Sequence, residues 1–307
     1  MSRRPQYKSV LHDSARWDDF EFRPGDIVIS TPPKCGTTWM QKICSLLIFQ
    51  NSRIETPLAI TSPWLDMLTK PKAEVFAQLA AQQHRRFIKT HTPLDGIPFN
   101  DRVTYICVGR DPRDVAISMF NHMANIDFEV FMEALHRVAV MEGADRPNVP
   151  PPPPPSLPPT AELFFWHWLD DPTPATDIPS SLLSTLHHFE AALSARLRPN
   201  VVVMHYGDLK TDLEAEMRRL AERLHIEVPQ QDWHELIAAA SFESMRARAD
   251  VTAPNADQKI WKDTRQFFHS GTGGHWREFF DDTAQQRYEA RVAVLASPEV
   301  AIWAHSG

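Results

Sequence analysis

The sequence has little of what a disulfide framework or a metal centre requires. Only three cysteines occur among 307 residues, at positions 35, 44 and 107, and no two of them form a C-x-x-C pair. This usage is typical of a reduced, cytoplasmic protein and not of a small secreted domain built on disulfides. The fourteen histidines are scattered along the chain, so the sequence predicts no metal site.

Long apolar runs and an excess of basic residues are also missing. No stretch approaches the roughly 18–20 apolar residues that a membrane span requires. The N-terminus lacks the apolar core of a signal peptide, so we expect a soluble, cytoplasmic protein without a membrane span. The formal net charge is −7, whereas nucleic-acid-binding proteins present basic patches and a high isoelectric point. Nucleic acid is therefore not an expected partner.

The order of predicted elements indicates an α/β protein with a central parallel sheet flanked by helices. After a polar N-terminal arm, predicted strands and helices alternate, the strands at 26–31, 86–90, 103–109 and 201–204 and the main helices at 36–50, 112–124 and 211–224. Short helical pieces are expected in the loop before residue 82. A proline-rich run at about 146–160 cannot form a helix or a central strand. We interpret it as a surface insert within a single domain, 1–307.

The first motif is a turn that joins a predicted strand to a helix, Thr31-Pro-Pro-Lys34-Cys35-Gly36-Thr37-Thr38-Trp39. The first backbone N–H groups of a helix and the positive end of its dipole bind phosphate, and Lys34 adds a mobile cation. Thr37 and Thr38 add hydroxyl donors. In nucleotide triphosphatases the lysine follows the glycine, whereas here Lys34 precedes Gly36. The sequence therefore predicts a P-loop-like anion-binding loop that is not a nucleotide triphosphatase loop.

Two further motifs stand where predicted strands end. Lys89 and His91 are two residues apart at the end of a strand, so both side chains are expected on one face. Arg110 follows the next strand, at the end of a sheet where α/β proteins bind ligands. Its alternative is an ion pair with Asp111 or Asp114. Ser118 lies about two helical turns further on, where it either binds a ligand or bonds back to a helical carbonyl.

These three motifs, in this order, resemble the cytosolic type of sulfotransferase that uses 3′-phosphoadenosine 5′-phosphosulfate (PAPS). The family's loop reads T-Y-P-K-S-G-T-T-W, its base motif K-T-H-x-P and its 3′-phosphate motif R-x-x-x-D-x-x-x-S. The likeness extends over most of the chain and is greatest to mycobacterial glycolipid sulfotransferases. It implies a P-loop-like 5′-phosphosulfate loop, PAPS as co-substrate without a metal, and His91, Lys34 and Lys89 as catalytic residues. Lys34 also belongs to the implied donor site, with Cys35, Gly36, Thr37, Thr38, Trp39, Arg110, Ser118, Tyr206, Phe242, Phe268, His269, Ser270 and Gly271.

The chain departs from the family pattern at two places. The family's late Arg-Lys-Gly clamp on the 3′-phosphate aligns with His269-Ser270-Gly271, so two cations are missing. Donor binding is then weaker, or Arg265 or Arg277 substitutes. The glycine-rich segment 271–274 is expected to act as a lid. The dimer motif of vertebrate members is unrecognisable at 277–286, so the sequence gives no support to a dimer of that kind and leaves the oligomeric state open.

The acceptor is expected to carry a hydroxyl group on a small molecule or a lipid. Loops at 53–82 and 125–180 are rich in apolar residues, which favours a glycolipid, a steroid or a phenol. The aromatic run Phe164–Trp168 is expected to serve packing more than the acceptor pocket. Two other hypotheses stay open at this point: a P-loop-like kinase that uses ATP, and a non-catalytic adaptor that docks through the prolines at 150–159.

Overall fold

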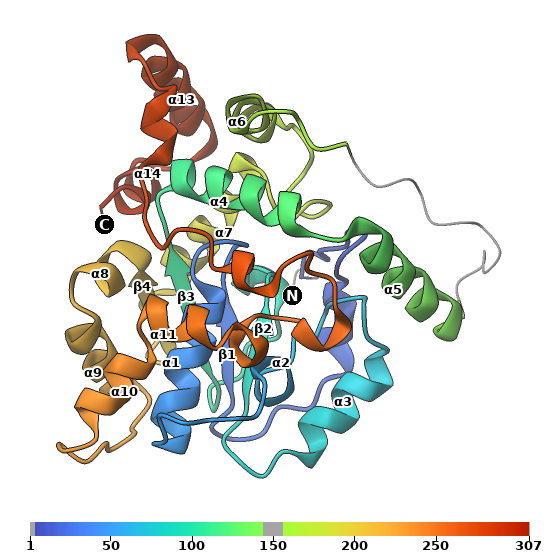
Figure 1. Ribbon diagram of the computed structural model, residues 1–307, viewed down its shortest axis with the longest axis vertical. Coiled ribbons are helices and arrows are strands. Elements are labelled where there is room, and N and C mark those ends of the chain that lie inside the picture. Colours follow the sequence, from blue (N-terminus) through green and yellow to red (C-terminus); the bar gives the residue numbers. More distant parts are fainter. Residues whose placement is uncertain (1–3, 144–155, 307) are drawn as a thin grey trace.

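The computed structural model describes residues 4–143 and 156–306 (Figure 1). Its centre is a parallel sheet of β1 (Ile27–Ser30), β2 (Phe87–Thr90), β3 (Thr104–Gly109) and β4 (Val201–His205). The spatial order is β2-β1-β3-β4. Because every pairing is parallel, the carboxyl ends of the strands meet at one edge of the sheet. The predicted α/β fold with a central parallel sheet flanked by helices is confirmed.

Helices cover both faces of this sheet. They are α1 (Thr37–Phe49), α2 (Leu58–Thr61), α3 (Lys72–Ala81), α4 (Pro112–Asn125), α5 (Phe128–Met141), α6 (Ala161–Asp170), α7 (Leu182–Ala195), α8 (Tyr206–Thr211), α9 (Leu213–Arg223), α10 (Trp233–Ala239), α11 (Phe242–Ala247), α12 (Ala249–Thr252), α13 (Asp282–Leu295) and α14 (Pro298–Ala304). Local chemistry sets their starts. Before α4, for example, the Asp111 carboxylate accepts a hydrogen bond from the Arg113 N–H, and Pro112 occupies the first helical position.

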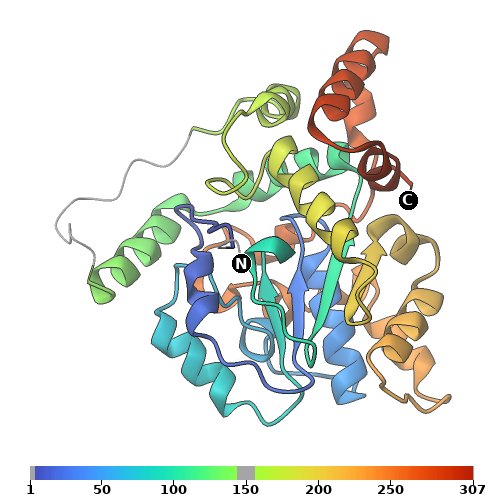
Figure 2. The same ribbon diagram turned by 180° about the vertical axis from the view of Figure 1, so that it is seen from behind.

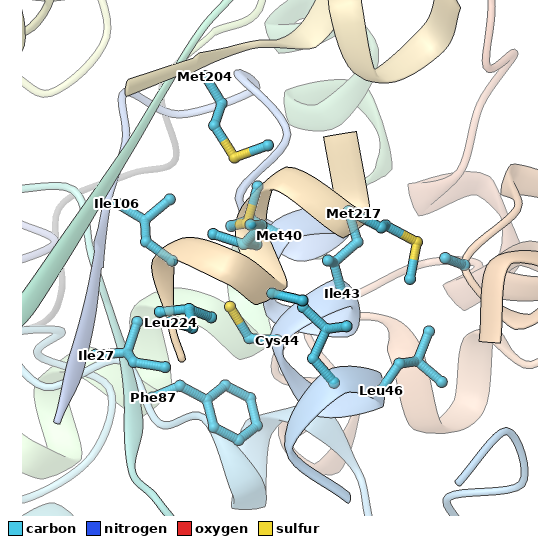
Figure 3. Close-up of a cluster of buried hydrophobic side chains, with 14 of the residues drawn as sticks. Ile27, Met40, Ile43, Cys44, Leu46, Phe87, Ile106, Met204, Met217 and Leu224 are labelled. Atoms are coloured by element: carbon cyan, nitrogen blue, oxygen red, sulfur yellow. The ribbon is translucent and has the colours of Figure 1, made fainter. Parts of the chain in front are cut away.

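Alternation along the strands divides the core between the two faces. Ile27 and Ile29 of β1 belong to the apolar cluster that packs against α1, α9 and α10, part of which Figure 3 shows. Val28 points the other way, into a cluster with residues of α3 and α7. The two views in Figures 1 and 2 show α1 and α7 on opposite sides of the sheet. Burial of both faces explains why the strands are apolar almost throughout.

The structure corrects two details of the sequence analysis. The N-terminal arm is only partly polar, because Tyr7 and Trp17 are just 1% exposed and Trp17 packs on Phe20 and Phe22. The predicted helix 211–224 is α9, which begins at Leu213 after the Asp212 cap, and the sequence analysis missed the short helix α8 that precedes it. The proline-rich insert falls mostly on 144–155, which lie outside the described residues.

Candidate active site

A cavity of about 980 Å³ opens at the carboxyl edge of the sheet, in the place where α/β proteins bind ligands. Its volume is at the upper end of the range for small-molecule sites, about 300–1,000 Å³. The residues predicted for the site come together around it, except Cys35: Lys34, Gly36, Thr37, Thr38, Trp39, Lys89, His91, Arg110, Ser118, Tyr206, Phe242, Phe268, His269, Ser270 and Gly271 all line it. One space therefore connects the three motifs and the late glycine-rich segment.

The loop between β1 and α1 has a backbone conformation that few residue types tolerate. Lys34 has φ = 68° and Gly36 has φ = 93°, both in the left-handed region. A Cβ atom on Gly36 would lie 2.9 Å from the Tyr206 ring, so glycine is required there. Cys35 is fully buried, and burial raises the pKa of its thiol to about 12. The thiol is therefore neutral and is not a nucleophile.

Three cations line the cavity without a carboxylate partner. Within the ranges 4–143 and 156–306, none of Lys34, Lys89 and Arg110 forms an ion pair. Burial, with Arg110 and Lys89 nearby, lowers the pKa of Lys34 to about 7. Burial likewise lowers the pKa of Lys89 to about 7, against the opposing effect of Asp66. Such a cluster is costly without an anion and therefore favours the binding of one.

Arg110 is held with part of its guanidinium free. Its NH1 group donates to the Lys34 carbonyl at 3.0 Å, and its plane lies 4.4 Å from the centre of the Tyr206 ring. Its Nε is buried and finds no hydrogen-bond partner among the described residues. The alternative of an ion pair with the neighbouring acids does not hold, because Asp111 pairs with Arg113 at 2.7 Å and Asp114 accepts the Gly274 N–H at 2.6 Å.

Anion binding at this cluster should take up protons. At pH 8, lysines with pKa values of about 7 are mostly neutral, and a bound anion raises those pKa values. We expect calorimetric titration with adenosine 3′,5′-bisphosphate at pH 8, in two buffers of different ionisation enthalpy, to show an uptake approaching about one proton at Lys34. Lys34→Gln should remove that uptake. Identical heats in the two buffers would contradict it.

His91 is held as a neutral base. Its Nδ1 lies 2.7 Å from the Thr31 carbonyl oxygen and donates its hydrogen to it, so Nε2 carries the lone pair. Burial, reinforced by Lys89, holds the pKa of His91 well below 6.5. The Trp64 ring contacts it edge-on, with 4.5 Å between ring centres. The same indole lies 4.2 Å from the Lys89 Nζ, so the expected common face of Lys89 and His91 is confirmed.

Aromatic side chains form the wall beyond the loop. The rings of Trp39 and Tyr206 meet edge to face at 5.2 Å, and the Trp39 indole donates to the Ala240 carbonyl at 2.8 Å. Phe242 and Phe268 meet at 6.1 Å. Gly271 approaches so closely that a Cβ atom there would lie 2.8 Å from the Phe242 ring. These four rings therefore combine packing with an aromatic surface on which a flat ligand can stack.

Neither arginine that the sequence offered in place of the missing clamp lines the cavity. Arg277 lies over Trp276, 4.4 Å from its ring centre, and Arg265 is exposed outside the lining. Lys210 of α8, one helical turn after Tyr206, is a further basic residue of the cavity lining.

The sequence placed Trp64 only among the apolar residues of the acceptor loops, and it gave no role to Asp66, which lies behind the cavity, or to His122. The His122 Nδ1 lies 3.3 Å from the Lys34 Nζ, and burial together with Lys34 holds the pKa of His122 well below 6.5. The helical spacing Ser118-x-x-x-His122 was a usable signal, because residues i and i+4 share one face of a helix. Trp64 and Asp66 follow no strand or motif, and only the fold brings them to β2.

Much of the remaining cavity wall is apolar. It includes Ile117, Met119 and Met123 of α4, Ile126, Phe128, Phe131 and Met132 of α5 and its approach, Phe164 and Trp168 of α6, and Ile260, Trp261 and Phe267 of the late segment. Phe164 and Trp168 are buried in a packed cluster and also line the cavity. The expectation that this run serves packing is thus right in part, since the two functions coincide in these side chains.

Residues 4–143 and 156–306 hold no set of three His, Cys, Asp or Glu side chains that could bind a metal ion. None of the helices in those ranges combines the length and the apolar character that crossing a membrane requires.

Comparisons with known proteins identify the family of the chain. The family model described as "Sulfotransferase domain" matches residues 24–293. A glycolipid sulfotransferase of Mycobacterium bovis is 42% identical over all of this chain and 96% of its own length, and one of Mycobacterium tuberculosis is equally similar. Retinol dehydratase in complex with androsterone and inactive cofactor PAP superposes with a TM-score of 0.66 at 21% identity, covering 93% of this chain and 86% of that one. That level of identity shows the fold alone. The chain belongs to the sulfotransferase family, and it is a sulfotransferase whose donor is PAPS.

Proposed function

We propose that the protein transfers the sulfuryl group of PAPS to a hydroxyl group of an apolar acceptor of the glycolipid type. One observation carries the proposal. A single cavity joins the unpaired cations Lys34, Lys89 and Arg110 and the neutral His91 to a broad apolar wall. An anion-binding cluster, a general base and an apolar surface are the three features that this reaction requires.

In the proposed reaction, His91 acts as general base. Its Nε2 accepts the acceptor's hydroxyl proton as the oxygen forms a bond to sulfur. The bond between sulfur and the bridging oxygen breaks, and adenosine 3′,5′-bisphosphate leaves. The Thr31 carbonyl stabilises the imidazolium that forms, because it accepts the hydrogen on Nδ1. A base with a low pKa is present in its reactive, neutral form throughout the neutral range.

Positively charged side chains stabilise the groups of the donor that carry or gain negative charge during the reaction. We assign Lys34 and the first amides of α1 to the leaving 5′-phosphate and Lys89 to the sulfonate oxygens. Arg110 and Ser118 are assigned to the 3′-phosphate, which distinguishes this donor from ATP. Lys210, which also lines the cavity, is assigned as the cation that supplements them in the absence of the family clamp.

The acceptor class follows from the wall and from the relatives. Two proteins that are 42% identical to this chain are glycolipid sulfotransferases. The apolar wall buries hydrocarbon, and each buried methylene contributes about 0.8 kcal/mol to binding. Several wall residues are methionines, which adapt to irregular apolar shapes.

Acceptor preference tests this proposal directly. We expect kcat/KM for a hydroxylated glycolipid to exceed that for the matching soluble sugar by at least about tenfold, because only the lipid reaches the apolar wall. Phe131→Ser should reduce the rate with the glycolipid and leave the rate with the sugar nearly unchanged. Val140→Ser, at an exposed position of the same helix, is the matched control. Equal turnover of the two acceptors would refute the lipid preference.

Three wider features complete the proposal. We place the protein in the cytoplasm, because its three cysteines are buried free thiols. We also treat residues 1–307 as a single sulfotransferase domain with a proline-rich insert. The kinase and adaptor hypotheses find no support in the relatives named above, which are sulfotransferases or share their fold.

A further inference from the structure

Asp66 is a buried carboxylate that the proposed mechanism does not use. It is completely inaccessible to solvent and accepts four hydrogen bonds. The donors are Trp17 Nε1 at 2.9 Å and Trp64 Nε1, Thr90 Oγ1 and Thr92 Oγ1, each at 2.6 Å. An ionised carboxylate offers about four acceptor positions, so this group is saturated. Such full satisfaction compensates the burial of its charge.

Trp64 connects this carboxylate to the reacting groups. While its indole N–H binds Asp66, its ring contacts the Lys89 ammonium and the His91 imidazole, at 4.2 and 4.5 Å. The main chain fixes the same neighbourhood, because the Lys89 N–H donates to the Pro63 carbonyl and the Leu65 N–H donates to the Lys89 carbonyl. The orientation of the indole is therefore set at both ends, by Asp66 on one side and by β2 on the other.

Two threonines at and just beyond the end of β2, Thr90 and Thr92, make a second set of contacts with the Asp66 carboxylate. Thr90 and Thr92 alternate with Lys89 and His91 along the chain, and successive side chains of an extended segment point to opposite faces. Both threonine hydroxyls donate to one oxygen of Asp66, on the face away from the cavity. The Asp66 carboxylate thus holds the segment on the face away from the cavity, while Trp64 contacts Lys89 and His91 on the face toward it.

We propose that Asp66 is a positioning residue for sulfuryl transfer, holding Trp64, Thr90 and Thr92 so that Lys89 and His91 keep their places against the donor and acceptor. The proposal rests on the roles proposed above for Lys89 and His91. Groups that orient reacting residues in this way typically contribute about 10- to 100-fold to activity.

Asp66 also acts on the charge of the cluster. Its negative charge raises the pKa of Lys89 against the effect of burial. The other titratable groups that interact with Lys89 are Lys34, His91 and His122, which bear no negative charge, and His12 faces Asp66 from the N-terminal arm. Without the carboxylate, Lys89 loses its proton at a lower pH.

The experiment compares Asp66→Asn with Trp64→Phe, which keeps a ring and the carboxylate but removes the hydrogen bond between them. The affinities for PAPS and for adenosine 3′,5′-bisphosphate are measured from pH 6 to pH 9. The parameters kcat and KM are measured with a hydroxylated acceptor. We expect Asp66→Asn to lower kcat by about 10- to 100-fold with bisphosphate affinity unchanged. PAPS should bind more tightly than the bisphosphate as long as Lys89 is protonated and contacts the sulfonate. As the pH rises, this difference in affinity should disappear at a lower pH in Asp66→Asn than in the wild type. Trp64→Phe should lower kcat without this shift.

A matched control is Asp95→Asn, which removes a carboxylate that binds Tyr7 outside the cavity. It should leave kcat and the pH dependence unchanged. Wild-type values in Asp66→Asn, or equal losses in the control, would overturn the proposal. If Asp66→Asn does not fold, wild-type kcat in Trp64→Phe overturns it. Failure of the proposed function would appear separately, as full activity in His91→Ala. The measurement of PAPS affinity does not depend on turnover, so it still tests the effect of Asp66 on Lys89.

Discussion

His91→Ala will abolish sulfuryl transfer while the protein still binds adenosine 3′,5′-bisphosphate. The imidazole is the neutral base at the cavity, with Nδ1 committed to the Thr31 carbonyl and Nε2 free to accept a proton. Loss of a general base costs about 10²–10⁴-fold in rate. The measurement is kcat with labelled PAPS and a hydroxylated acceptor, beside a titration with the bisphosphate to show an intact donor site.

Two controls make this result specific. His234→Ala removes an exposed histidine of α10 that lies outside the cavity, and it should leave kcat unchanged. The pH dependence supplies the second control. Because the pKa of His91 is well below 6.5, the wild-type rate should not fall between pH 8 and pH 6.5 through protonation of the base. A His91→Ala variant that retains more than about a tenth of the wild-type rate would remove His91 from the catalytic role.

The parts of the fold that sequence predicts well are those in which local pattern and tertiary contact agree. The strands are apolar almost throughout because both faces of the sheet are covered, and the turn at Lys34–Gly36 carries the glycine that a left-handed backbone requires. Lys89 lies near the end of β2 and His91 and Arg110 directly follow strands, so parallel pairing alone brings them to one edge. These residues were predictable because their positions depend on strand periodicity and topology.

The residues that were missed depend on long-range packing. Trp64 and Asp66 lie in a segment without helical or strand periodicity, and they reach β2 only because the chain returns along that strand. The N-terminal arm contains many polar residues, but Trp17 is buried because Asp66 accepts its indole N–H. His122 carries a helical signal, yet its contact with Lys34 requires α4 to cross the loop after β1. Such contacts cannot be read from local sequence.

Arg110→Ala will remove most of the preference for a 3′-phosphate, the feature by which this donor differs from AMP. In the wild type, a ligand at about 100 times its dissociation constant adds about 2.7 kcal/mol to the free energy of unfolding and raises Tm by several degrees. We expect the bisphosphate to give this shift with or without magnesium, and AMP at the same concentration to give much less. In Arg110→Ala the two shifts should become similar, because a charge-assisted contact is lost.

The neighbouring residues determine how complete that loss is. His269 and Ser270 stand where the family has cations, so little replaces Arg110 except Lys210. Lys210→Ala should therefore reduce the preference by a smaller amount, and Arg265→Ala, at an exposed position outside the cavity, should leave it unchanged. Arg110→Lys keeps the charge but loses the planar fork, so an intermediate preference is expected. A wild-type preference that persists in Arg110→Ala and disappears in Lys210→Ala would move the 3′-phosphate site from the end of β3 to α8.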